Sequence, residues 1–327
     1  MYMYKKIANN NTLKYVIKMD VRLSGFTNTS ITGYVETNKD VLVKAVVLGT
    51  VAGDTIPNLK KQFGVKTKEK LNVLNVDPAI QDGENCGWTP SGSTSFSNRE
   101  VETAQLKAQD GYCDRDLLGT FAEYLVKINA QKVPGDLPFE GYIMDEVVRG
   151  INEKMEKLVW QGSKTGGDLI DGFLTQALGD DSASTITVTA SSATSMYARA
   201  QAVIMAIPED ILDKAVLFLS PANFRKLIFE LVEKNLYHFA PGADIEDKDV
   251  YFPGTEVRIH KTIGLKNNDN IYASLYENMV YGCDLEGDNE KVRFWFDDAD
   301  ELFKYNIRWN AGVKTLFPDM VVVGSIA

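Results

Sequence analysis

The strongest pattern in the sequence is a single apolar stripe that recurs at helical spacing through residues 139–162. Its apolar side chains follow one another at steps of four, four, four and three residues: Ile143, Val147, Ile151, Met155 and Leu158. This spacing predicts an amphipathic helix about 33 Å long at a rise of about 1.5 Å per residue. Gly162 suits the position just after the last helical residue. A helix of this length with one apolar stripe can brace a sheet.

Residues 66–108 predict a long β-hairpin. Two partly alternating segments flank a polar tip, residues 81–98, that is rich in Gly, Ser, Asn and Pro. Neither segment has enough apolar residues to bury a full face within its own domain, and a two-stranded ribbon alone is marginal in water. We therefore expect a neighbouring subunit to cover this hairpin. A disordered surface loop is the alternative.

The chain on either side of these two elements alternates between strand and helix patterns. Residues 1–45 predict an extended arm that leads to a first strand near Val41–Leu48. A helix is expected at 114–130, and a turn-rich link into a short strand or turn at 162–177. The remaining expected elements are strands at 185–190, 215–220, 292–297, 302–317 and 320–325, a turn then a strand at 251–263, a strand followed by a short helix or turn at 270–285, and helices at 192–212 and 220–235. Ser220 and Pro221 are good first residues for the last of these helices.

Two inferences about architecture follow from this order. The alternation of helices and strands between about 185 and 285 predicts a compact α/β unit. The strand-like run at 302–317 is longer than one compact domain usually holds, because most strands span about five or six residues. We therefore expect an elongated molecule.

The sequence gives little support to enzyme chemistry. Its only histidines are His238 and His260, and its three cysteines, Cys86, Cys113 and Cys283, are too widely spaced for a metal knuckle. The established nucleotide, zinc-protease, hydrolase and calcium motifs are all missing. GSKTGGD at 162–168 follows a helix and lacks the phosphate-loop ending, and the acidic run at 243–249 lacks calcium-loop spacing. We predict no catalytic, cofactor-binding or metal-ligating residue.

Charge and hydropathy narrow the possible partners. The 327 residues carry 45 acidic and 35 basic side chains, a net charge of −10, with the basic residues dispersed. Duplex recognition needs clustered Lys and Arg, so specific nucleic-acid binding is not expected. No membrane span or signal peptide is recognised, and a reducing cytoplasm is expected. The aromatic side chains near the end of the chain are interpreted as core and interface packing: Phe294, Trp295, Phe296, Tyr305 and Trp309.

Three strings, taken in order, carry a resemblance to a known family. They are YIMDEVVRGINEKMEKLVWQGSKTGGDLIDGFLTQ (142–176), LFLSPANFRKL (217–227) and the C-terminal series FPGTEVRI (252–259), ENMVYGCD (277–284) and FKYNIRWNAGVKTLFPDMVVV (303–323). Together with the order of elements they resemble the Hong Kong 97-like major capsid proteins of tailed bacteriophages. The resemblance covers most of the chain.

The resemblance implies an α+β fold with an N-arm, an E-loop hairpin, a P-domain with a long spine helix, and an A-domain. On this sequence the arm would be 1–45, and the P-domain 46–184 would include the E-loop (66–108) and the spine helix (139–162). The A-domain would be 185–290. The long strands of 291–327 would return through the P-domain to the A-domain.

The same resemblance implies a structural protein rather than an enzyme. Such proteins assemble into hexamers and pentamers that form the icosahedral head shell and enclose double-stranded DNA without sequence-specific binding. The implied location is the virion capsid, assembled in the host cell cytoplasm. Scaffolding, portal, and decoration or head-completion proteins are the expected partners. Some family members join an E-loop lysine to a distant asparagine. Here Lys66, Lys68, Lys70 and Lys107 lie on the hairpin arms and Asn306 and Asn310 on the terminal strand, but no pair is matched residue by residue, so the cross-link is not carried over.

Other functions remain open at this point. An encapsulin-type nanocompartment resembles the same fold and would enclose a cargo enzyme. An enzyme with an unfamiliar site would need a pocket around His238 or His260. A tail-tube or decoration protein would form tubes, or would lack the long helix.

Overall fold

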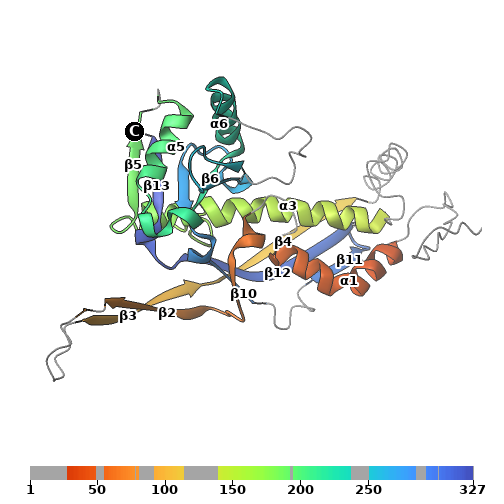
Figure 1. Ribbon diagram of the computed structural model, residues 1–327. Helices are drawn as coiled ribbons and strands as arrows, with labels where there is room; N and C mark the ends of the chain where they lie inside the picture. Colours follow the sequence, from red (N-terminus) through yellow and green to blue (C-terminus); the bar gives the residue numbers. More distant parts are fainter. Residues whose placement is uncertain are drawn as a thin grey trace, which may run out of the picture.

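The structure is a computed structural model, and the residues it describes are 28–48, 55–77, 79–80, 92–113, 139–191, 194–236, 250–284, 292–300 and 302–326. Helix α3 (Phe139–Gln161) lies along a five-stranded sheet and ends beside a second, six-stranded sheet (Figure 1). A two-stranded ribbon projects from the body. The molecule is therefore elongated, as the long terminal strand predicts.

Strand β12 (Leu302–Thr315) is the centre of the five-stranded sheet. The other strands are β1 (Lys60–Phe63), β4 (Ala104–Cys113), β10 (Met279–Asp284) and β11 (Val292–Asp297). β10 and β11 pair with the two halves of β12 along one side, and β4 pairs along the other, all antiparallel. β1 is parallel to β10 and forms an edge. The 14-residue length of β12 lets one strand join all the others except β1.

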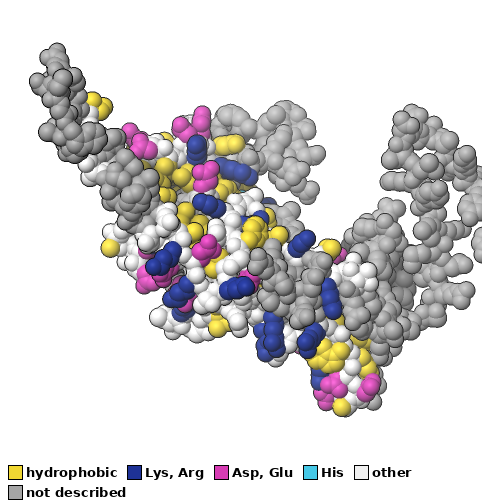
Figure 2. Space-filling view, turned by 90° about the horizontal axis from the view of Figure 1, so that it is seen from below, with side chains coloured by type: hydrophobic (Ala, Val, Ile, Leu, Met, Phe, Trp, Pro, Cys, Tyr) yellow, Lys and Arg dark blue, Asp and Glu magenta, His cyan; other side chains and the backbone are white. Residues whose placement is uncertain are grey.

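The two faces of this sheet differ because side chains alternate along β12. On the face that α3 and α1 (Asn28–Leu48) cover, the buried side chains are Phe303, Ile307, Trp309, Ala311 and Val313. On the other face the alternate positions are polar and at least partly exposed: Lys304, Asn306, Arg308 and Asn310. Figure 2 shows the molecule from the side opposite α3, where Lys and Arg side chains recur. The aromatic residues Phe294 and Trp309 are core residues, as predicted, whereas Trp295 is 40% exposed.

The six-stranded sheet has the order β5–β13–β9–β6–β8–β7. Its strands are β5 (Ile186–Ala190), β6 (Val216–Leu219), β7 (Val250–Tyr251), β8 (Arg258–Lys261), β9 (Ile271–Ser274) and β13 (Val322–Ile326). Helices α5 (Met196–Met205) and α6 (Pro221–Glu233) pack with it around a second core. The predicted 185–290 range includes β10, which pairs in the other sheet, whereas β13 comes from beyond that range.

The remaining helices are short. They are α4 (Phe173–Leu178) and the 3₁₀ turns η1 (Ile56–Asn58), η2 (Glu209–Lys214), η3 (Ile263–Leu265), η4 (Tyr276–Asn278) and η6 (Pro318–Met320). The predicted cap of α6 is present, because the Asn223 backbone N–H donates to the Ser220 hydroxyl at 3.2 Å. The predicted helix at 114–130 lies outside the described residues.

Three predictions about individual elements are wrong. Residues Val41–Leu48, predicted as a strand, belong to helix α1, because Leu42, Val46 and Val47 are buried in the core that includes α3. The run of β-branched residues favours a strand locally, but packing overrides that preference. Any extended arm is therefore shorter than the predicted 1–45. The segment after α3 forms helix α4, where a strand or turn was expected at 162–177.

The third correction concerns the hairpin at 66–108. Its arms are β2 (Lys68–Asp77) and β3 (Ser93–Glu102), and the predicted second arm at 100–109 breaks at Thr103. Beyond that break the chain enters β4, where Leu106 is buried in the five-stranded sheet. Residues 100–109, in which a few apolar side chains alternate with polar ones, are therefore divided between β3 and β4.

A buried carboxylate ties α3 to two distant segments. The Glu156 carboxylate accepts hydrogen bonds from the backbone N–H groups of Thr55 and Ile56 at 2.6 and 3.3 Å. It also accepts from the Thr262 hydroxyl at 3.0 Å, and the Trp160 indole N–H donates to the Thr55 hydroxyl. Glu156 is fully buried, so these donors take the place of water around its carboxylate.

Candidate functional site

The ribbon formed by β2 and β3 has little cover of its own among the described residues. Its strands pair only with each other among the described strands, from Lys68 opposite Glu102 to Asp77 opposite Ser93. The described side chains in its outer half are exposed or half-buried, and its two cross-strand ion pairs, Lys68–Glu102 and Lys70–Glu100, span 3.7 and 4.0 Å. Such exposed pairs contribute little stability. The conformation of the ribbon therefore depends mainly on the contacts at its base.

The base of the ribbon crosses the five-stranded sheet over two glycines. Gly282 of β10 and Gly312 of β12 lie directly opposite each other. A Cβ added to Gly312 would lie 2.0 Å from the carbonyl oxygen of Glu102, and one added to Gly282 would lie 2.7 Å from the Val101 side chain. Both positions must therefore lack a side chain for the ribbon to lie against the sheet. Val101 is completely buried at this crossing.

Backbone contacts fix the chain at the same crossing. The Thr103 N–H donates to the Thr67 carbonyl at 2.9 Å, and the Thr103 hydroxyl donates to the Val65 carbonyl at 3.1 Å. The Val65 N–H in turn donates to the carbonyl of Cys283 in β10. These bonds join both arms of the ribbon to the sheet at one point, which sets the direction in which the ribbon leaves the body.

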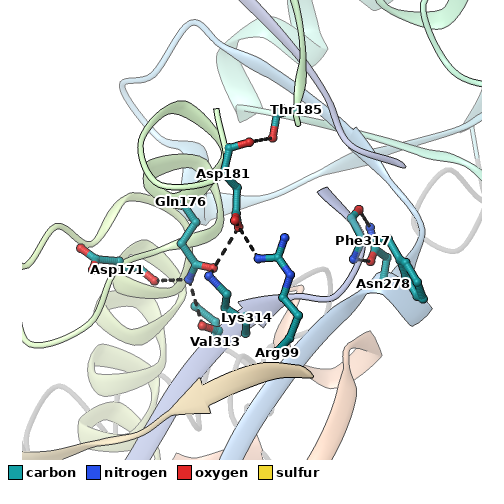
Figure 3. A network of polar contacts seen from close by, with 9 residues as sticks. All are labelled: Arg99, Asp171, Gln176, Asp181, Thr185, Asn278, Val313, Lys314 and Phe317. Carbon is teal, nitrogen blue, oxygen red and sulfur yellow. Dashed lines mark hydrogen bonds and ion pairs between the residues drawn. The ribbon is translucent and has the colours of Figure 1, made fainter. Parts of the chain in front are cut away.

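A charged cluster holds the ribbon from the side (Figure 3). Arg99 of β3 donates to the Asp181 carboxylate at 2.7 Å, and the ammonium of Lys314 in β12 lies 3.4 Å from the other oxygen. Asp181 is only 9% exposed, so this carboxylate is shielded from water. It follows α4 in the turn before β5, and the Thr185 hydroxyl donates to its carbonyl. The cluster thus connects the ribbon, the central strand and the turn that leads to the six-stranded sheet.

Neighbouring amides hold this turn and the end of β12 in place. Gln176 donates to the carbonyls of Asp171 and Val313 at 2.7 and 2.9 Å. Asn278 donates to the Phe317 carbonyl and accepts from its N–H, at 2.8 and 2.7 Å (Figure 3). These bonds join α4 to β12, and η4 to the chain that follows β12.

The second ionic anchor comes from the turn after α3. Lys164 lies 2.8 Å from the Glu102 carboxylate, and its hydrogen bond holds the pKa of that carboxyl below its usual range. The turn is the GSKTGGD segment (162–168), whose Ser163 and Lys164 backbone N–H groups donate to the carboxylates of Asp168 and Asp171. Because nearby acidic side chains occupy these donors, the segment positions Lys164 and does not resemble a phosphate-binding loop.

The side chains weighed as candidates for chemistry are not gathered together. His260 is 9% exposed and meets the rings of Phe218 and Tyr276 edge-on, and Cys283 is buried in β10. His238, Cys86 and the acidic run 243–249 lie outside the described residues, as does the Cys113 side chain. Across the described ranges, no group of three His, Cys, Asp or Glu side chains is placed to hold a metal ion. In that same part of the chain, no helix is long and apolar enough to cross a membrane.

Residues Arg99, Asp181 and Lys314 do not stand out in the sequence as a set. Arg99 and Asp181 are 82 residues apart, and Asp181 and Lys314 are 133 apart, so no local pattern links them. One signal was present: Gly282 and Gly312 interrupt otherwise regular strands, and glycine inside a strand often marks a close backbone approach. Of the lysines weighed for a cross-link, Lys68 and Lys70 pair with ribbon glutamates.

Comparison with known proteins finds similar folds but no similar sequences. No protein-family model matches the sequence, and neither does any curated protein. A chain of the satellite phage P4 procapsid, which includes the size determination (Sid) protein, is similar with a TM-score of 0.58 and 9% identity, over 95% of this chain and 94% of that chain.

Two further structures are similar over most of their length. A capsid chain of the empty GTA particle matches with a TM-score of 0.54 and 10% identity, over 85% of this chain and 91% of that one. The holo-SrpI encapsulin of Synechococcus elongatus PCC 7942 matches at 0.53 and 11% identity, over 87% and 94%. The chain has the fold that phage capsid and encapsulin shells share. This confirms the predicted Hong Kong 97-like fold, without testing how the chain divides into sub-domains.

Proposed function

We propose that this protein is the major capsid protein of a tailed phage, a structural protein that assembles into the hexamers and pentamers of an icosahedral head. The observation that carries the proposal is the ribbon, which is anchored at its base by Arg99, Glu102 and Thr103 and whose described side chains farther out are exposed or half-buried. A ribbon held in a fixed direction can contact a second copy in a head-to-tail manner, and such contacts close into rings. The fold shared with shell proteins supports the same function.

We assign the parts of the molecule as follows. The ribbon is the E-loop, α3 is the spine helix, and the five-stranded sheet belongs to a P-domain within 46–184 that residues 291–327 complete. The six-stranded sheet is the A-domain, within 185–290, to which β13 returns. The N-arm is limited to the residues before α1. Under this assignment β10 is an A-domain excursion into the P-domain sheet.

Partners and location follow from this function. Scaffolding, portal and decoration or head-completion proteins would act on the shell, which would form in the host cytoplasm and become the virion capsid. The chain carries a net charge of −10, so a genome of double-stranded DNA would be enclosed with weak, sequence-independent contact. Nanomolar affinity for duplex DNA that does not change with salt would contradict this part of the proposal.

The second candidate is an encapsulin-type nanocompartment, which the similarity to the Synechococcus shell favours. The contents of purified shells separate the two functions. Nuclease-protected double-stranded DNA supports the phage head, and one stoichiometric co-purifying enzyme supports the nanocompartment.

The deciding experiment is electron microscopy of the full-length protein after size-exclusion chromatography, over a range of salt and crowding agent. We expect closed shells, or rings of five and six subunits. A ribbon-shortened variant, with residues 72–98 replaced by an Asn-Gly turn, keeps the Leu71–Arg99 pair that a two-residue hairpin loop requires. We expect it to fold and to lose shell formation.

The matched control for this variant is the double substitution Lys70→Ala and Glu100→Ala, which removes an exposed ion pair and leaves the ribbon its full length. We expect shells from the control. Wild-type protein that stays monomeric in every condition, or shells of normal size from the shortened variant, would contradict the proposal.

A further inference from the structure

Helix α6 has an exposed apolar stripe in addition to its buried one. Leu227 and Leu231 are buried in the second core. Phe229 lies on the opposite side of the helix, because two residues turn an α-helix by about 200°. Phe229 is 67% exposed, and Val232, three residues on, is 55% exposed. In Figure 1, α6 lies at the edge of the molecule opposite the ribbon. Two large apolar side chains therefore face solvent on one side of this helix.

The exposed stripe has the spacing by which one helix packs along another. Its residues follow one another at steps of three, four and three, and all four are exposed: Ala222, Arg225, Phe229 and Val232. Alternating steps of three and four keep side chains on one line along a helix, as in a coiled coil. The aliphatic part of Arg225 can cover apolar surface while its guanidinium stays in water. A second helix would therefore find a continuous line of contacts along α6.

The charged residues beside the stripe are complementary between two copies of the helix. Lys226 and Glu233 are both exposed and lie seven residues apart on the same flank of α6. A two-fold axis brings equal flanks of two antiparallel helices together, so Lys226 of each copy would lie beside Glu233 of the other. Antiparallel packing also places the N-terminal end of one helix beside the C-terminal end of the other, which their dipoles favour. The charges therefore select a second copy in the antiparallel orientation.

We propose that α6 forms a two-fold contact between two copies of this chain, with the helices antiparallel and Phe229 of each copy packed against Val232 of the other. Lys226 and Glu233 form two equivalent ion pairs along one flank of this contact. A two-fold contact closes at two copies, whereas the ring contacts of the proposed shell are head-to-tail. The ribbon takes no part in the pairing, so the pairing does not depend on the proposed function.

The size of the helix sets the strength of this contact. α6 has 13 residues and is about 20 Å long at a rise of about 1.5 Å per residue. Two such helices bury well under the roughly 1,200 Å² at which stable interfaces begin, which is the range of weak and transient contacts. We therefore expect a reversible dimer with a dissociation constant of about 10–500 µM. The same contact becomes stronger wherever other contacts hold two copies together.

Charge reversal tests the orientation of the two helices. The dissociation constant is measured by sedimentation velocity on the unassembled fraction of the full-length protein. Lys226→Glu and Glu233→Lys should each weaken the dimer at least about fivefold, because like charges then meet at both symmetric positions. The double variant exchanges the two charges and should restore the wild-type value. Lys214→Glu changes an exposed lysine outside α6 and is the matched control, which should leave the dimer unchanged.

A substitution in the stripe tests the apolar contact. Phe229→Asp should abolish the dimer, because it places a charge at the centre of the contact. Met205→Asp, at an 80% exposed position on α5, is the matched control and should leave the dimer unchanged. Circular dichroism of each variant checks that the protein is folded. A carbodiimide, which joins amines directly to carboxylates, should link Lys226 to Glu233 between copies in a mixture of light- and heavy-isotope protein.

Three results would overturn the pairing. They are a wild-type protein that stays monomeric up to about 500 µM, a dimer that Phe229→Asp does not weaken, and a double charge reversal that does not restore the dimer. Dimers with these properties in a protein that never forms shells would support the pairing and contradict only the proposed shell function.

Discussion

The strands of the ribbon and those of the six-stranded sheet differ in how they are stabilised. Every residue of β6 and β9 is buried, between helices and neighbouring strands. The described side chains of β2 and the outer half of β3 are exposed or half-buried, and only Val101 at the base is completely buried. The sheet completes its core within one copy, whereas the ribbon is positioned by one copy and, in the proposed assembly, covered by another. Substitutions in the sheet should therefore lower the free energy of unfolding, whereas substitutions in the ribbon should mainly reduce shell formation.

The largest expected effect is on the stability of the sheet. Phe218 of β6 is fully buried and its ring centroid lies 5.0 Å from that of Trp160. Phe218→Ala should lower the free energy of unfolding by about 3–5 kcal/mol, because it leaves a cavity in the core that it shares with α3. Leu71→Ala in the half-buried ribbon should cost less than about 1 kcal/mol and should reduce shell formation instead. Urea unfolding of unassembled subunits measures both, and similar losses at the two sites would remove the contrast.

The next largest effect is at the buried carboxylate of α3. Glu156→Gln replaces an acceptor of three hydrogen bonds by a group that also donates, so at least one backbone N–H loses its partner. The expected loss of unfolding free energy is about 2–4 kcal/mol. Glu153→Gln, one turn away and exposed in its ion pair with Arg149, is the control and should cost under about 0.5 kcal/mol. A thermal melt that shifts equally in both variants would show that Glu156 does not join α3 to Thr55 and Thr262.

The ribbon crossing should be sensitive to a single methyl group. In Gly312→Ala the new Cβ would lie 2.0 Å from the Glu102 carbonyl oxygen, so the ribbon must shift. We expect a loss of about 1–3 kcal/mol from overpacking, together with misassembled shells in electron micrographs. Gly150→Ala in α3 meets nothing within 4 Å and should raise stability by about 0.5–1 kcal/mol through helix propensity. Normal shells from Gly312→Ala would mean that the crossing does not set the direction of the ribbon.

The Asp181 cluster should contribute less to stability than to orientation. Asp181→Ala leaves Arg99 and Lys314 without their shared carboxylate, at an expected cost of about 1–3 kcal/mol. A double-mutant cycle with Arg99→Ala should give a coupling energy of about 0.5–1.5 kcal/mol. Faster proteolysis of the ribbon in both variants, but not in Lys70→Ala, would show that the cluster restrains it. A coupling energy near zero would argue against this restraint.

The smallest effect is a dependence on pH at the second anchor. The pKa of Glu102 is held below its ordinary value of 4.5, chiefly by the hydrogen bond from Lys164. A lowered carboxyl pKa stabilises the folded state above the unfolded value, and this contribution disappears as the pH falls through the folded value. Because Glu102 is about half exposed, with 47% of its side chain accessible, the contribution is at most about 1 kcal/mol. Stability curves from pH 7 to 3 should be flatter for Glu102→Gln, and identical curves would exclude the anchor as a source of pH dependence.

The elements that sequence reasoning predicted correctly are those with a local periodic signal. The four-residue spacing of the apolar side chains in α3 and the cap at Ser220 are readable within one or two helical turns. The ribbon was also recognisable, because its scarcity of apolar residues is a local property. The end of the ribbon at Glu102 was not recognisable, because apolar and polar residues alternate in the same way before and after the break at Thr103. Only pairing with β12 assigns Leu106 to the sheet.

The sequence alone therefore determined the long helix, the buried strands around 215–220 and 320–325, the two-stranded character of the ribbon and the scarcity of residues suited to catalysis. These depend on periodicity and composition, which are properties of neighbouring residues. The tertiary structure decided that Val41–Leu48 is helical, that two glycines make room for the ribbon, and that one aspartate holds Arg99 and Lys314 together. Those outcomes depend on contacts between residues 82 or more positions apart or on burial against α3, and such contacts exist only once the chain has folded.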